Sequence, residues 1–380
     1  MSNSDLSKAK TGKNDEFYTQ FVDIQKELMS YLDFNPKLFE GKTILLPCDD
    51  PESSNFTKFF AQNFENMGIK KLISTSYAPD SKNFKSNYQP TLFETTNTNY
   101  DSKKTKKNGK IFILERDATG DGIIDVNDLE WNYLKGDGDY RSDEIKKLRD
   151  EADFIITNPP FSLFRHFLSW IVSANKKFLI IGNMNAITYK EVFPLIMSDK
   201  LWLGPTITSG DREFQVPDEY PVTASGWRID DDGKKYLRIK GVRWFTNIDH
   251  GRRHQILPLM TMSDNLKFNK KLKGKTSYDK YDNFDAIEIP FTDAIPSDYE
   301  GIMGVPISFL DKYNPDQFEI IGNGQTMANE LGIKPVGQKF VDDYYQQGNK
   351  GQINAKWNNL VFHIEEKVVV PYQRILIKHK

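Results

Sequence analysis

The sequence predicts an α/β protein: a doubly wound, largely parallel sheet over residues 1–205, followed by a mixed, β-containing region over residues 206–380. Three observations support this. Short apolar runs alternate with amphipathic stretches in the first region, as in βαβ units. After about residue 206 that alternation stops, and prolines and an Asp-Gly pair separate short β-like runs. At 380 residues, 38% hydrophobic and 13% aromatic, the chain can form two cores.

The elements of the first region follow from apolar spacing. Strands are predicted where apolar, often β-branched residues run together, and helices where apolar residues recur every three or four positions. The predicted strands are 43–46, 71–74, 153–157 and 178–182. The predicted helices are 24–31, 56–64 and 163–171. We expect residues 80–135 to be an insertion or loop region, because residues 80–110 are rich in Ser, Asn, Thr and Lys, although Ile111–Leu114 resembles a strand.

Composition narrows the class of protein. The start of the chain has no apolar signal region, and no apolar run approaches the roughly 20 residues of a membrane span, so we expect no membrane association. Cys48 is the single cysteine, which excludes an internal disulfide and a cysteine-based zinc cluster. We therefore expect a protein of the reducing cytoplasm.

Asn158-Pro159-Pro160-Phe161 is the most informative stretch. It follows a predicted buried strand and precedes a predicted helix, so it lies at the edge of the sheet where ligands of open α/β sheets bind. Asn-Pro-Pro is also an ordinary turn sequence. The strand before it and the helix after it favour a functional site over an ordinary turn.

These four residues suit methylation of an amino group on a planar ring. The Asn158 side-chain oxygen and the Pro159 carbonyl can each accept one hydrogen of the amino group, which localises the nitrogen lone pair without an ionised base. Pro159 and Pro160 fix the backbone before substrate arrives. Phe161 offers a face for a flipped base such as adenine.

Basic residues cluster in the middle of the chain. Residues 201–280 hold 15 Lys and Arg against 10 Asp and Glu, whereas residues 281–380 hold 9 against 14. In the basic part, cationic and aromatic residues alternate, as in surfaces that contact phosphates and bases. A solvated pair of strands would give the same pattern. The candidate DNA-binding residues are Arg228, Arg243, Arg252, Arg253 and His254.

An acidic stretch has the spacing of an EF-hand calcium loop. Oxygen-bearing side chains stand at loop positions 1, 3, 5, 9 and 12, with Gly122 at position 6. These candidate ligands are Asp117, Thr119, Asp121, Asp125 and Asp128. Aspartate at position 12 is short for bidentate coordination, and the run before the loop resembles a strand rather than a helix. An acidic hairpin without metal is therefore favoured over a structural calcium site.

Several blocks together resemble the EcoRI-type family of adenine-specific DNA methyltransferases. The resemblance covers most of the chain from about Asn14 to the end, and the block order is that of the γ group of amino methyltransferases. The matching blocks are NDEFYT (14–19), PCDDPESSNF (47–56), GDGDYRSDE (136–144), NPPFSLF (158–164), GVRWFTNIDHGRRH (241–254) and residues 301–322. The resemblance implies a Rossmann-like methyltransferase sheet in residues 1–205 and DNA target recognition in residues 206–380, which could also add strands to the catalytic sheet.

The resemblance also implies a set of residues around S-adenosylmethionine. Phe17, Tyr18 and Thr19 match the segment that closes over its methionine end, with Gln20 where the family often has proline. Asp139 and Tyr140 match an acidic-aromatic pair beside its adenine; alone, they would read as a turn.

The loop after the first strand lacks the usual glycine-rich sequence. Asp49 and Asp50 stand there instead, after Pro47, and carboxylates at this position can accept hydrogen bonds from a cofactor's ammonium or ribose. Ser54 and Asn55 are either cofactor contacts or the cap of the next helix.

From this resemblance we expect a monomeric, S-adenosylmethionine-dependent enzyme of restriction-modification or phage type, bacterial or phage-encoded. We expect it to methylate adenine N6 in double-stranded DNA, with or without a cognate restriction endonuclease. One alternative is a methyltransferase acting on RNA bases or on a protein glutamine. Those enzymes usually lack a long region after the Asn-Pro-Pro tetrad, whereas this chain has more than 200 residues there. The second alternative is a non-catalytic nucleic-acid-binding or calcium-binding protein with a methyltransferase fold.

Overall fold

The computed structural model describes residues 18–49, 54–79, 90, 92–208, 211–216 and 226–380. The chain forms two compact units. Unit 1 comprises Met1–Ala186 and Leu203–Gly251, and unit 2 comprises Ile187–Trp202 and Arg252–Lys380. Residues 206–251 pack with the first part of the chain as one unit, so no boundary between the units lies at residue 205. The functional division at residue 205 remains a prediction.

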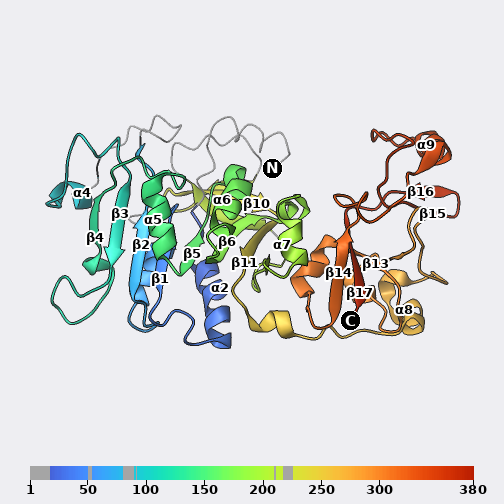
Figure 1. The fold of residues 1–380 in the computed structure, drawn as a ribbon, viewed down its shortest axis with the longest axis horizontal. Helices are drawn as coiled ribbons and strands as arrows, with labels where there is room; N and C mark the ends of the chain where they lie inside the picture. Colours follow the sequence, from blue (N-terminus) through green and yellow to red (C-terminus); the bar gives the residue numbers. More distant parts are fainter. Residues whose placement is uncertain (1–17, 50–53, 80–89, 91, 209–210, 217–225) are drawn as a thin grey trace. The chain divides into compact units, whose positions relative to one another are not determined.

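An eight-stranded sheet has the strand order β4-β3-β2-β1-β5-β6-β11-β7 (Figure 1). Its central strands are parallel: β1 pairs with β2 and β5, and β5 pairs with β6. Strands β3, β4 and β11 join by antiparallel pairing. The strands are β1 (Thr43–Leu46), β2 (Lys71–Thr75), β3 (Lys110–Leu114), β4 (Glu130–Tyr133), β5 (Phe154–Thr157), β6 (Lys177–Asn183), β7 (Trp202–Leu203) and β11 (Val242–Thr246).

The central strands β1 and β5 are largely apolar because both faces of the sheet are covered. All four residues of β1 and all four of β5 are buried. Near-continuous apolar runs are typical of parallel strands in this position. The predicted α/β fold class, with its parallel central strands, is confirmed.

Helices cover this sheet, and their ends follow ordinary capping rules. Ser54 accepts hydrogen bonds from the backbone N–H groups of Phe56 and Thr57, so α3 begins at Asn55. Gly182 in β6 lets α6 approach, because a Cβ there would lie 2.4 Å from the Phe164 ring. The helices of unit 1 are α2 (Phe21–Phe34), α3 (Asn55–Gln62), α4 (Leu92–Thr96), α5 (Asp143–Glu151) and α6 (Phe164–Val172).

The expected insertion over residues 80–135 is partly a piece of the sheet. It contributes β3, as expected for Ile111–Leu114, and also β4. Glu94 and Lys110 form a buried ion pair at 2.9 Å, so part of the expected insertion or loop region packs against the protein. Its hairpin carries the short 3-10 helix η2 (Val126–Asp128).

A second, three-stranded sheet belongs to unit 1 and has the order β8-β10-β9. Its strands are β8 (Asp211–Val216), β9 (Trp227–Ile229) and β10 (Lys235–Lys240). Phe214, Val216, Leu237 and Ile239 pack into the same core cluster as β1 and β5. The mixed, β-rich character expected after residue 206 therefore begins within unit 1.

Unit 2 contains a four-stranded sheet, order β12-β13-β17-β14, and a hairpin of β15 and β16. Arg374 on β17 forms a buried ion pair with Glu288 on β12, at 2.6 Å, and Tyr281 donates to the same carboxylate. The strands are β12 (Ile287–Glu288), β13 (Met303–Pro306), β14 (Phe318–Asn323), β15 (Phe362–Ile364), β16 (Lys367–Val369) and β17 (Arg374–His379). The helices are α7 (Phe193–Met197), α8 (Met262–Phe268) and α9 (Gly337–Gln346).

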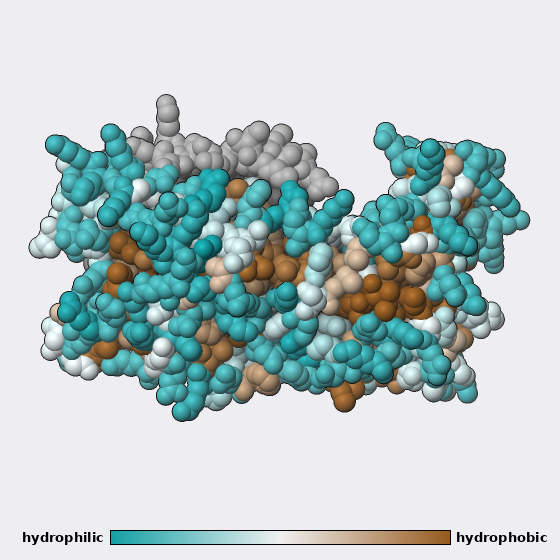
Figure 2. Space-filling model, viewed as in Figure 1, coloured by the Kyte–Doolittle hydropathy of each residue, from teal (hydrophilic) through white to brown (hydrophobic). Residues whose placement is uncertain are grey.

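The other elements of the described residues are short stretches of 3-10 helix. They are η3 (Phe161–Leu163), η4 (Met184–Thr188), η5 (Gly251–His254), η6 (Lys270–Leu272), η7 (Thr292–Ala294) and η8 (Ile307–Lys312). The face drawn in Figure 2 is largely hydrophilic.

Candidate active site

The loops that follow β1, β2 and β5 lie at one edge of the large sheet, because these strands are parallel neighbours. Each loop carries polar or aromatic side chains that the fold brings together. This edge is where ligands of open α/β sheets bind. The site is therefore built from segments far apart in sequence.

The tetrad 158–161 leaves the end of β5 as expected. Asn158 is half-buried and Pro159 is buried, and the Leu163 N–H donates to the Pro160 carbonyl at 2.9 Å as η3 begins. The Phe161 ring packs edge-on against Phe214 of β8, with ring centroids 6.3 Å apart. One side of Phe161 is thus fixed by the small sheet.

Asp49, in the loop after β1, is bonded to the protein itself. Its Oδ1 accepts from Ser54 Oγ at 2.8 Å and its Oδ2 accepts from Thr157 Oγ1 at 2.6 Å. The carboxylate is buried, with 7% of the residue exposed. These contacts favour a role in holding the loop rather than the expected direct contact with a cofactor; Asp50 lies outside the described residues.

Ser54 and Asn55 do more than cap α3. Asn55 Nδ2 donates to the Thr19 carbonyl at 2.8 Å, which ties the amino-terminal segment to the start of the helix. Tyr18 forms an antiparallel bridge with Gln215 of β8. The segment around Thr19 therefore lies beside the β1 loop, and Phe17 lies outside the described residues.

Asp139 and Tyr140 join the site through the end of β2. The Asp139 carboxylate forms an ion pair with Arg141, so it shares its acceptor capacity with a neighbouring guanidinium. Tyr140 packs edge-on against Phe167 and Trp170 of α6. Burial raises the pKa of Tyr140 to about 12, so its hydroxyl is a neutral donor at physiological pH.

Tyr77, two residues past β2, is a site residue that the sequence reasoning missed. Its hydroxyl lies near Tyr140, and burial, followed by the Cys48 thiol and the Asp139 carboxylate, raises its pKa. In the sequence, Tyr77 could have been identified by its position just after a buried strand, at the same edge of the sheet as Asn158. Pro47 is held there too, because Thr75 Oγ1 donates to its carbonyl at 3.2 Å.

Two buried side-chain oxygens at this edge have no hydrogen-bond partner among the described residues: Thr19 Oγ1 and the Tyr140 hydroxyl. Buried polar groups are almost always satisfied, so such atoms indicate a missing partner. Both can donate to a polar ligand. The residues present therefore fit a cofactor with acceptor groups, such as a carboxylate.

Comparison with known proteins agrees with this geometry. Residues 5–380 match the model of the family described as adenine-specific methyltransferase EcoRI. The chain belongs to this family. The family resemblance inferred from the motif blocks is confirmed, and the protein is a methyltransferase.

The curated relatives support the same assignment. Type II methyltransferase M.EcoRI from Escherichia coli is 42% identical over 316 residues, covering 83% of this chain and 88% of the relative. M.MgeORF184P from Mycoplasma genitalium, also named a type II methyltransferase, is 33% identical over 92% of this chain and 95% of its own length. M.MpnI from Mycoplasma pneumoniae, with the same description, is 32% identical, covering 83% and 84%. No solved structure matches the chain.

Two of the candidate DNA-binding arginines are buried, which does not favour direct contact with DNA. Arg243 is 6% exposed, and its guanidinium donates to the carbonyls of Val242 and Thr208. Arg253 is 8% exposed, pairs with Asp199 and lies 3.7 Å from the centre of the Trp202 ring. Both arginines hold loops together.

The other three basic candidates reach the surface to different degrees. The Arg228 side chain is half exposed, pairs with Glu213 at 3.0 Å and lies 4.4 Å from the centre of the Tyr236 ring. His254 is exposed and Arg252 is partly exposed. Their contact with DNA remains a prediction.

The acidic loop is a hairpin between β3 and β4, and its contacts do not favour the calcium site. The five candidate residues bond within the loop: Asp117 accepts from the Gly120 and Gly122 amides, and Asp128 from Ala118, Thr119 and Asp125. Asp121 and Asp125 accept from backbone amides two residues on. Strands rather than helices flank it, and no acidic or histidine cluster among the described residues could hold a metal.

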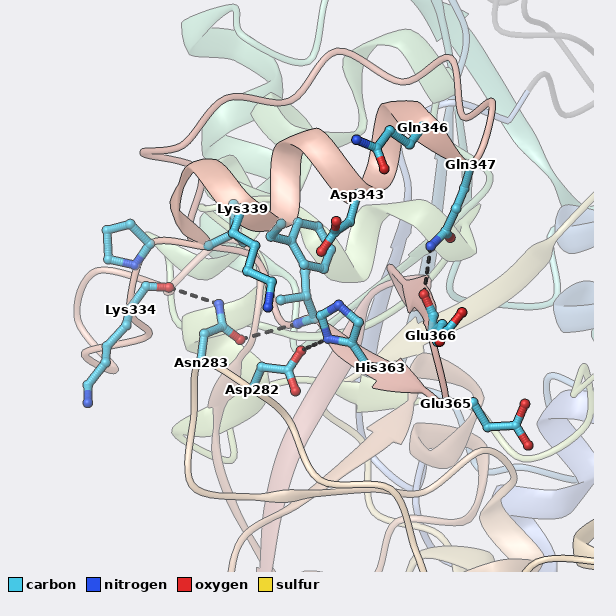
Figure 3. Close-up of a pocket in the computed structure, with 14 residues that line it drawn as sticks. Asp282, Asn283, Lys334, Lys339, Asp343, Gln346, Gln347, His363, Glu365 and Glu366 are labelled. Atoms are coloured by element: carbon cyan, nitrogen blue, oxygen red, sulfur yellow. Dashed lines mark hydrogen bonds and ion pairs between the residues drawn. The ribbon is translucent and has the colours of Figure 1, made fainter.

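Unit 2 has a separate, open cavity of about 830 Å³ beside α9 and the hairpin of β15 and β16. Figure 3 shows the His363 ring paired with Asp282, at 2.6 Å, and Lys339 reaching over them. The side chains that line this cavity carry charges of both signs, with acidic groups in the majority.

Among the described residues, no helix is both long and apolar enough to cross a membrane.

Proposed function

We propose that this methyltransferase transfers a methyl group from S-adenosylmethionine to N6 of an adenine flipped out of double-stranded DNA. One observation carries the proposal: Asn158-Pro159-Pro160-Phe161 follows a buried parallel strand, at the sheet edge where Thr19 and Tyr140 present unsatisfied hydroxyls. The adenine-specific family of the chain supports the choice of base.

The tetrad would act by orienting the amino group. The Asn158 side-chain oxygen and the Pro159 carbonyl each accept one N6 hydrogen, so the nitrogen lone pair is drawn out of conjugation. Pro159 and Pro160 keep these acceptors in place, which makes the geometry ready before substrate binds. As the N–C bond forms, the bond between the methyl carbon and the sulfonium sulfur would break, leaving a neutral thioether, and one N6 proton would be released to solvent.

Phe161 would hold the extruded base. Its edge contact with Phe214 fixes the ring orientation. Base–aromatic stacking contributes about 1 to 3 kcal/mol per base in single-strand-binding proteins, which helps offset the cost of extrusion.

S-adenosylmethionine, when bound, supplies an electrophilic methyl group on a sulfonium centre. Thr19 and Tyr18 would contact its methionine end, and Tyr140 and Tyr77 would line the pocket beside its adenine. The Asn55 contact with the Thr19 carbonyl would keep that segment in place at the start of α3. Ser54 would act indirectly, through Asp49.

Residues 206–380 are proposed to recognise the DNA. The small sheet of β8, β9 and β10 packs on Phe161 through Phe214 on its inner face, and its other face points away from Phe161. On that face Arg228 stacks on Tyr236, and both side chains suit contact with phosphate and base. A cognate endonuclease is not required for the reaction.

The direct test is product analysis. The full chain is incubated with S-adenosylmethionine carrying a labelled methyl group and with double-stranded DNA, RNA or protein extract, and nucleosides and amino acids are separated. The expected product is N6-methyladenine from DNA. Label in RNA or in glutamine, with none in DNA, would contradict the proposal.

A further inference from the structure

Asp49 connects the catalytic tetrad to the rest of the site, although it lies 108 positions from Thr157 in the sequence. Its Oδ2 accepts the hydroxyl of Thr157, the last residue of β5, at 2.6 Å. Thr157 is fully buried and directly precedes Asn158. A buried side-chain bond therefore holds the residue from which the tetrad starts.

On the side of the tetrad that faces β1, backbone pairing ends before Thr157. The ladder between β1 and β5 pairs Ile44 with Phe154 and Leu45 with Ile155. On the other side, pairing with β6 continues to Thr157, opposite Ile180. The Asp49–Thr157 bond thus connects the two strands beyond the end of their ladder.

Asp49 is itself fixed from two further elements. Its main-chain carbonyl accepts from Ser74 Oγ of β2 at 2.7 Å, and its Oδ1 accepts from Ser54, the cap of α3. Ser74 in turn bonds Thr57 at 3.0 Å. Buried carboxylates are costly unless hydrogen-bonded, and these donors offset that cost.

We propose that Asp49 is a positioning residue: acting through Thr157, it sets the location of the Asn158 acceptor relative to the cofactor side of the site. The inference rests on the proposed function, since it needs Asn158 to bind the amino group. Small displacements of a positioned group reduce turnover strongly. Substrate binding is affected less, because Asp49 and Thr157 do not contact the substrate in this proposal.

The test removes the Thr157 hydroxyl. Thr157→Val is expected to lower kcat about tenfold or more, while KM for DNA and Kd for S-adenosylmethionine change less than about twofold. Thr157→Ser keeps the hydroxyl and should restore most of kcat. Thr105→Val is the matched control: Thr105 is buried and donates to the buried Glu94 carboxylate, near the β3 and β4 edge of the sheet, so its kcat should stay normal.

A double-variant cycle tests the pathway through Asp49. Asp49→Ala removes the acceptor and should lower kcat at least as much as Thr157→Val does, and the combined variant should be no slower than the worse single variant, because both changes break the same bond. If Thr157→Val fails to fold, Thr157→Ala, which also lacks the hydroxyl, carries the same expectation against Thr105→Val. Normal kcat in the folded variant would overturn the inference. Asn158→Ala in the same assay separates the two failures: if it too is fully active, the proposed function is wrong.

Discussion

The loop after β1 and the hairpin between β3 and β4 are both rich in aspartate, yet their carboxylates bond in opposite ways. Asp49 accepts hydroxyls from Ser54 and Thr157, which belong to different elements. Asp117 and Asp128 accept backbone amides from their own loop. The first pattern joins distant segments, and the second shapes one turn.

The role of an acidic residue near a sheet therefore depends on which elements donate to its carboxylate. A carboxylate satisfied by its own loop needs no other part of the protein, so its sequence spacing says little about a site. A carboxylate satisfied from other strands and helices fixes their relative positions. We expect carboxylates of the second kind, those satisfied from other elements, to affect activity and stability more than carboxylates of the first kind.

The largest expected effect lies at the residue that the Asp49 bond positions. Asn158→Ala removes one of the two proposed amino-group acceptors, and we expect turnover to fall about a hundredfold or more. Binding of S-adenosylmethionine, measured by calorimetry, should stay near normal. Near-normal turnover would contradict the proposed role of Asn158 as an acceptor of the amino group.

The comparison itself is tested by paired aspartate variants. Asp49→Ala leaves two buried hydroxyls without their acceptor and is expected to destabilise the protein by about 2 to 4 kcal/mol. Asp117→Ala removes contacts of an exposed loop and should lower the melting temperature much less. Equal shifts of the two melting temperatures would show that Asp49 stabilises the protein no more than Asp117 does.

A second pair of variants extends the comparison to arginines. Arg253→Ala breaks a contact with Asp199 and uncovers Trp202, so we expect a loss of about 1 to 3 kcal/mol in stability. Arg228→Ala should leave stability nearly unchanged and lower the logarithmic salt slope of DNA binding by about one. An unchanged slope, measured by fluorescence anisotropy, would place Arg228 outside the DNA interface.

The smallest effect concerns pH and calcium in the acidic loop. Backbone donors, Gly122 first for Asp117 and Asp125 first for Asp128, hold the pKa of each carboxyl below the ordinary value of 3.8. The stabilisation is therefore present above pH 3.8 and is lost as pH falls through the lowered pKa.

Hydrogen exchange of the loop amides checks the acidic-loop prediction. Protection at Gly120 and Gly122 should decrease below pH 3.8, and millimolar calcium at neutral pH should not change it. A clear rise in protection or melting temperature with calcium would show that the loop rearranges to bind metal.

Much of the fold was predictable because it depends on local pattern. Unbroken apolar runs identified β1 and β5, since strands covered on both faces carry few polar residues. Asn158–Phe161 was placed at a strand end from its flanks alone. The acidic spacing of 117–128 was misleading as a metal pattern, because an EF-hand also needs flanking helices and β3 and β4 stand there instead.

Tertiary structure decided which polar side chains belong to the site and which to the interior. Nothing near Asp49 in the sequence indicates Thr157, and nothing near Arg253 in the basic run distinguishes it from Arg252. Their environments are set by groups that arrive from other elements, Thr157 Oγ1 in one case and Asp199 and the Trp202 ring in the other. Sequence periodicity determines which face of an element is buried; the partner of a buried charge depends on how distant elements pack.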